Sequence, residues 1–155
     1  MALFGRKKKE ENAIITLDDI RVGEKSVDKF EAIRMAGRML VAKGCVDENY
    51  IEGMVEREKI MTTYMGEGVA IPHGVGELKK FVKKTGIVVL QFPDGVDFDG
   101  ETAHLVVGIA GAGEDHIPIL QGIATVMMDE DIIADFVKSQ DKKYIMKQLT
   151  DNVEL

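Results

Sequence analysis

Apolar residues recur at helical spacing in the first third of the chain. We expect a helix there, capped by Ser26 and ended by Gly44, because its apolar positions follow a helical period: Phe30, Ile33, Ala36 and Leu40. A second helix is expected after Asp47, with an apolar face formed by Ile51, Met54 and Val55. Residues 13–16 predict either a short edge strand or an extended lead-in.

Continuous apolar runs mark the centre of the chain. Residues 86–92 and 103–110 lack the polar alternation of a half-exposed strand, so they predict strands covered on both faces. A shorter strand is expected at residues 69–71, ended by the sharp turn Pro72-His73-Gly74. Residues 93–95, Pro-Asp-Gly, predict a turn that ends the 86–92 strand.

The last third of the chain is expected to be helical. Asp115 can cap a helix that runs to about residue 128, and two shorter helices fit residues 130–138 and 141–149. Alternating helices and strands favour a single α/β domain, which we place at residues 13–155. We interpret residues 1–12 as a flexible basic tail, because a run of charges of this kind is usually solvated. No apolar segment follows the charges, so they do not form a secretory signal.

Composition narrows the class of protein. The chain has 155 residues, the length of one ordinary domain, and a formal net charge of -7 at pH 7. This charge argues against non-specific binding of nucleic acid, which needs a basic surface. No apolar run approaches the roughly 18 residues that a membrane span needs. The single cysteine, Cys45, excludes an intrachain disulfide bond and fits a small buried side chain better than a nucleophile.

Two histidines lie in the segments that follow predicted strands. His73 lies in the turn after the 69–71 strand, and His116 opens a helix after the 103–110 strand. If these strands are parallel neighbours, the two imidazoles can meet at one sheet edge. A neutral imidazole is a nucleophile that forms covalent intermediates, and the amides at a helix N-terminus attract an anion while keeping His116 neutral. Arg57 could add a cation for phosphoryl oxygens.

Plainer interpretations of the same residues remain open at this point. His73 could be a polar turn residue, and His116 could simply lie in a capping region. Arg57 and Glu67 could be solvated charges. A zinc site formed by His73, His116, Glu67 and Asp115 is the rival chemistry, but the sequence has no His-x-x-x-His or Cys-x-x-Cys pair to support it, so we expect neither a metal nor a cofactor.

Five segments of the chain form a series of motifs with a distinctive order and spacing: 54–59, 64–74, 84–89, 91–96 and 113–117. This series resembles the enzyme IIA family of the mannitol/fructose branch of the bacterial sugar phosphotransferase system, and the resemblance covers about residues 14–150. Phe92-Pro93-Asp94-Gly95-Val96 is most similar to the mannitol subgroup. The family fold is a mixed, mostly parallel sheet with helices on both sides, which agrees with the α/β pattern.

The resemblance implies a function and a set of site residues. His73 would be the phosphorylated histidine, with His116, Arg57 and Glu67 in the active site. The phosphoryl donor would be the histidine phosphocarrier HPr, and the acceptor a cysteine on a IIB domain of a sugar permease. The protein would then be cytoplasmic and serve the uptake of mannitol or a related sugar. The alternative is a nitrogen-type regulatory IIA that acts through phosphorylation-dependent protein binding.

Overall fold

The computed structural model describes residues 13–155, and the expected tail at residues 1–12 lies outside this range. The helices are α2 (Lys29–Ala42), α3 (Asn49–Ile60), α4 (His116–Met127), α5 (Glu130–Lys138) and α6 (Lys142–Asn152), with short 3-10 helices η1 (Leu17–Asp19) and η2 (Gly76–Phe81). The strands are β1 (Ile20–Arg21), β2 (Tyr64–Gly66), β3 (Val69–Ala70), β4 (Gly86–Phe98) and β5 (Glu101–Ala110). Of the two options for residues 13–16, the extended lead-in is confirmed, with the Ile14 carbonyl accepting a hydrogen bond from the Ile87 amide.

The five strands of residues 13–155 form one sheet in the order β1-β4-β5-β3-β2. β1 runs parallel to β4 and β3 parallel to β5, whereas β4 with β5 and β2 with β3 are antiparallel. The mixed sheet is therefore confirmed, but the expectation that parallel pairing predominates is wrong. The longest ladder is the β4–β5 hairpin, whose two turn residues Asp99 and Gly100 both have positive φ, as tight hairpins need.

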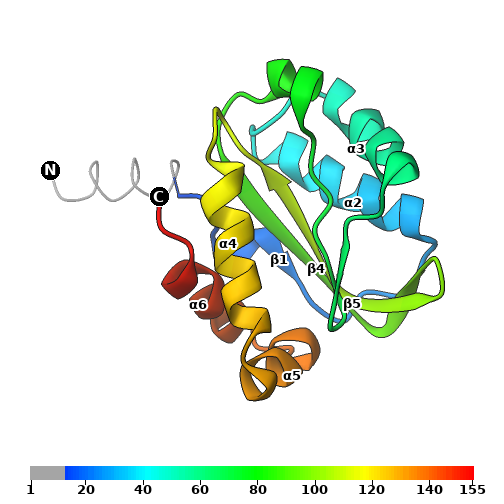
Figure 1. Ribbon diagram of the computed structural model, residues 1–155, viewed down its shortest axis with the longest axis vertical. Coiled ribbons are helices and arrows are strands. Elements are labelled where there is room, and N and C mark those ends of the chain that lie inside the picture. Colours follow the sequence, from blue (N-terminus) through cyan, green and yellow to red (C-terminus); the bar gives the residue numbers. More distant parts are fainter. Residues whose placement is uncertain (1–12) are drawn as a thin grey trace, which may run out of the picture.

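Helices cover both faces of this sheet, as expected (Figure 1). Side chains of β4 point alternately to the two faces, because strand residues have a period of two. Val88, Leu90 and Phe92 pack in the core beneath α2 and α3. Ile87 and Val89 belong to the second core, formed with α4, α5 and α6. A sheet buried on both faces explains why the runs in β4 and β5 are continuously apolar.

Two local expectations are corrected. The cap of α2 is Asp28, whose carboxylate accepts the Phe30 and Glu31 amides, while the Ser26 hydroxyl donates to the Gly95 carbonyl instead. Both residue types cap helices well, so the pattern alone did not separate them.

The turn expected at residues 93–95 is also wrong, because this segment lies inside β4. The pairing of β4 with β5 shifts register between Gln91 and Val96, and Gly95 has a φ of 83°. The proline and glycine therefore make a bulge in a long strand, which needs the same residue types as a turn.

Among residues 13–155, no helix combines the length and the apolar character that crossing a bilayer requires.

Candidate functional site

Parallel pairing of β3 and β5 brings the two loop histidines to the same edge of the sheet. Val69 pairs with Leu105 and Ala70 with Val106, and the parallel register continues as a bridge between His73 and Ile109. The chain then leaves β5 through a small-residue loop and begins α4 at His116. The condition set by the sequence, that these strands be parallel neighbours, is thus met.

His73 is buried, with 8% of its surface exposed. Its Nδ1 lies 2.6 Å from the carbonyl oxygen of Ile71. A carbonyl only accepts hydrogen bonds, so Nδ1 carries the proton and Nε2 of the neutral ring keeps its lone pair.

Burial lowers the pKa of the His73 imidazole below its ordinary range. The bond to the Ile71 carbonyl acts in the opposite direction, but the positive charges of Arg57 and Lys79, and that of His116 when its ring is protonated, lower the pKa further. This influence shows that the three groups lie near His73. The imidazole is therefore kept neutral at neutral pH.

A buried tyrosine from α3 holds the His73 turn against the sheet. The Tyr50 hydroxyl accepts from the Gly74 amide at 2.6 Å and donates to the Ile109 carbonyl at 2.8 Å. Burial raises the pKa of Tyr50 to about 12, so the hydroxyl keeps its proton across the physiological range. A Cβ added at Gly74 would lie 2.7 Å from the Tyr50 ring, which explains the glycine after His73.

Replacing Tyr50 by phenylalanine should lower the free energy of unfolding by about 1–3 kcal/mol, because a buried amide and a buried carbonyl lose their partner. Tyr64→Phe is the matched control, since the Tyr64 hydroxyl also joins an amide, of Gly68, to a carbonyl, of Thr102, but near solvent. Urea unfolding of both variants measures the difference. Equal losses would contradict a special role for Tyr50.

His116 is the first residue of α4, where backbone amides point outward from the helix. Lys79 of η2 places its ammonium 2.7 Å from His116 Nδ1 and also donates to the carbonyls of Gly111 and Gly113. A Cβ at Gly111 would lie 2.5 Å from the His116 amide nitrogen, so only glycine lets the loop turn this tightly into α4. The contacts of Lys79 therefore hold both the loop at residues 111–113 and the His116 imidazole in place.

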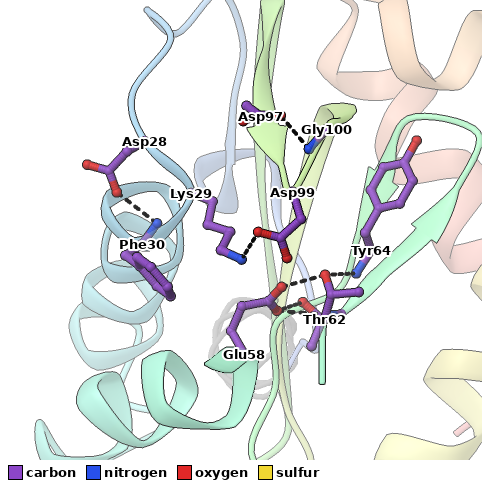
Figure 2. Close-up of polar contacts among 10 residues, drawn as sticks. Asp28, Lys29, Phe30, Glu58, Thr62, Tyr64, Asp97, Asp99 and Gly100 are labelled. Atoms are coloured by element: carbon purple, nitrogen blue, oxygen red, sulfur yellow. Dashed lines mark hydrogen bonds and ion pairs between the residues drawn. The ribbon is translucent and has the colours of Figure 1, made fainter. Parts of the chain in front are cut away.

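Arg57 lies in the last turn of α3, as expected. Its Nη1 donates to the Met61 carbonyl at 2.7 Å. The neighbouring Glu58 is buried and accepts a hydrogen bond from the Thr62 hydroxyl (Figure 2). It also accepts hydrogen bonds from the amide and the hydroxyl of Thr63. Glu58 thus fixes the loop that holds the Arg57 guanidinium.

The structure does not bring Glu67 to this group. Glu67 lies in the turn between β2 and β3, with a φ of 51° and an exposed side chain. It borders a hollow formed with the C-terminal end of α4 and with α5, including Met127 and Val137. β3 leads away from this turn toward His73, so the two side chains lie at opposite ends of the strand. In the structure Glu67 is therefore separate from the group of side chains around His73.

Sequence reasoning missed two residues that shape the site. Lys79 stands in a run of charged residues, which is normally solvated, and Tyr50 lies outside the apolar face expected for the second helix. Neither has a local signal, because their contacts with His116 and Ile109 span 37 and 59 positions of the chain.

Residues 13–155 contain no group of three or more His, Cys, Asp or Glu side chains that could hold a metal ion.

Comparison with known proteins identifies the type of domain. The family model described as "Phosphoenolpyruvate-dependent sugar phosphotransferase system, EIIA 2" matches residues 13–152. The chain belongs to this family. The resemblance inferred from the histidine and arginine motifs is thereby confirmed.

Individual members of the EIIA 2 group agree in sequence and fold. The mannitol-specific phosphotransferase enzyme IIA component of Geobacillus stearothermophilus is 41% identical over 139 residues, covering 89% of this chain and 96% of that protein. The crystal structure of mannitol IIA from Escherichia coli matches with a TM-score of 0.79 at 38% identity, covering 87% of this chain and 98% of that chain. A complex of mannitol enzyme IIA and phosphorylated mannitol enzyme IIB from Escherichia coli matches with a TM-score of 0.81 at 35% identity, covering 88% and 97%.

Proposed function

We propose that this chain is the IIA phosphoryl carrier of a mannitol phosphotransferase system. It takes a phosphoryl group from the phosphohistidine of HPr onto Nε2 of His73 and passes it to a cysteine of the IIB domain. The observation that carries this proposal is the state of His73, a buried neutral imidazole whose Nδ1–H is held by the Ile71 carbonyl, with Nε2 left as the nucleophile.

The surroundings of His73 suit a phosphoryl group. Phosphoryl transfer passes through a loose transition state whose charge is spread over the oxygens, so positioning and charge stabilisation supply most of the catalysis. Arg57, His116 and the N-terminus of α4 offer a guanidinium, an imidazole and backbone amides for those oxygens. The N–P bond to HPr breaks as the N–P bond to His73 forms, and the later transfer breaks this bond as an S–P bond to the IIB cysteine forms.

Exposed apolar side chains next to the site favour a protein rather than a free sugar as the reacting partner. Val75 lies two residues after His73, Ile117 follows His116, and Ile60 and Met61 lie at the end of α3 beside Arg57. Apolar side chains around a polar centre are typical of the core of a protein interface. HPr and IIB would each cover them while reaching Nε2.

The mannitol system is favoured over the nitrogen-type regulatory alternative. The relative that is 41% identical and the solved structure that is 38% identical both carry mannitol in their names. The complex with phosphorylated IIB supports that domain as partner. We place this chain in the cytoplasm as part of the same proposal.

The deciding experiment follows the phosphate. The purified chain is incubated with phosphorylated HPr, the modified residue is mapped by mass spectrometry, and the labelled chain is then offered to IIB domains from mannitol and fructose permeases. We expect an acid-labile phosphate on His73 and fastest transfer to the mannitol IIB. A label on another residue would refute the carrier site. A label on His73 that passes to no IIB domain would favour the regulatory alternative.

The pH dependence of phosphate acceptance should reflect the lowered pKa of His73. An ordinary histidine is half protonated near pH 6.5, whereas burial and the neighbouring cations keep His73 neutral at more acidic pH. We therefore expect the rate to stay level between pH 8 and about 6.5 and to fall only below that value. An NMR titration of the His73 ring, compared with that of a histidine peptide, separates this effect from titration of HPr. A His73 midpoint at or above the peptide value would contradict the prediction.

A further inference from the structure

The ammonium of Lys79 lies within hydrogen-bonding distance of three groups. An ammonium carries three N–H donors and no lone pair. In this structure Nζ contacts two carbonyl oxygens, of Gly111 and Gly113, and the Nδ1 atom of His116 at 2.7 Å. Because the ammonium has no lone pair, it can only donate, and its three N–H groups match these three contacts. Nδ1 of His116 must then accept, and the ring proton of neutral His116 must be on Nε2.

We propose that Lys79 is a positioning residue that fixes the Nε2–H tautomer of His116 and so makes this imidazole a hydrogen-bond donor to the phosphoryl group on His73. The proposal rests on the function proposed above. The two histidines then have complementary roles. Nε2 of His73 presents a lone pair because Nδ1 is held by a carbonyl, and Nε2 of His116 presents a proton because Nδ1 is held by an ammonium.

This arrangement is built from elements that are distant in sequence. Lys79 belongs to η2, which follows the His73 turn, whereas its three partners lie in the loop after β5 and at the start of α4. The same side chain also contributes positive charge that lowers the pKa of His73. One lysine therefore connects the loop carrying the nucleophile to the helix carrying the donor. Two carbonyl contacts hold its Nζ in place, so the side chain is more ordered than a solvated lysine.

The test measures the tautomer directly. Long-range ¹H–¹⁵N spectra of the His116 ring are recorded at pH 8, where an ordinary imidazole is neutral, for the unmodified chain and for Lys79→Met, Lys79→Arg and Lys80→Met. Lys80 is the matched control, because it lies on the same 3-10 helix and is exposed over the Phe81 ring. We expect the Nε2–H pattern in the unmodified chain, in Lys80→Met and in Lys79→Arg, and a mixture of tautomers in Lys79→Met.

Phosphoryl transfer from phosphorylated HPr gives the second readout. Transfer in Lys79→Met should be about tenfold slower. This factor is the lower end of the loss seen when a histidine that binds a metal loses the hydrogen-bond partner of its other ring nitrogen, which is the analogous change. The rate should be unchanged in Lys80→Met and partly restored in Lys79→Arg. An Nδ1–H pattern in the unmodified chain would overturn the proposal even if Lys79→Met does not fold. So would an unchanged tautomer in a folded Lys79→Met. The spectra need no phosphoryl donor, so failure of the carrier function would show separately as no labelling of the unmodified chain.

Discussion

Replacing His73 by alanine is expected to reduce phosphate acceptance from HPr to the background of the assay. Without the imidazole there is no nucleophile to form the covalent intermediate, and binding of the partner cannot compensate for a missing chemical group. The rates of labelling and of transfer to the mannitol IIB domain should fall together. Circular dichroism and urea unfolding should still report a folded chain, with a free energy of unfolding lower by about 1–3 kcal/mol for the lost buried group.

His104→Ala is the control for this variant. His104 is half-buried at the other end of β5, and its Nδ1 also donates to a carbonyl, that of Phe92 at 3.1 Å. The two substitutions therefore remove similar side chains and similar hydrogen bonds. We expect His104→Ala to keep its phosphate acceptance. Labelling that survives in His73→Ala, or that disappears equally in His104→Ala, would refute His73 as the carrier residue.

The candidate site residues His73 and His116 have local signals in the sequence. Pro72-His73-Gly74 directly follows a short apolar strand, and His116 begins a helix after another strand. For the two histidines to meet, β3 and β5 had to be parallel neighbours, and the structure shows this pairing. Arg57 was a candidate because a planar guanidinium suits phosphoryl oxygens, and it lies in the last turn of α3.

The rest of the site depends on contacts that sequence patterns do not encode. Glu67 is close to His73 along the chain, but an extended strand carries six residues over a long distance, so the two lie at opposite ends of β3. Lys79 shows the reverse, because it is distant from His116 in sequence and in direct contact with it in space. The bulge at residues 93–95 was taken for a turn, since proline and glycine mark both.

Arg57→Met should slow phosphoryl transfer by roughly 10²-fold, a typical cost of losing one preorganised donor to a developing oxyanion. A guanidinium has five N–H donors. The hydrogen bond to the Met61 carbonyl orients the group and uses one of these donors, so the others can bind phosphoryl oxygens. Arg57→Lys should be intermediate, because the charge is kept and the planar fork is lost. Stopped-flow or quenched-flow transfer from phosphorylated HPr measures all three rates.

The same substitution gives an independent signal at His73. Positive charge on Arg57 helps to lower the pKa of the His73 imidazole, so the His73 midpoint in an NMR titration should move upward in Arg57→Met. Arg38→Met is the matched control, since Arg38 lies on the exposed side of α2 and pairs with Glu31 at 3.0 Å. A slower transfer without a change in the His73 midpoint would mean that Arg57 contacts only the partner. An unchanged rate with a shifted midpoint would mean that its charge acts on His73 alone, and Arg57 would not be a phosphoryl ligand.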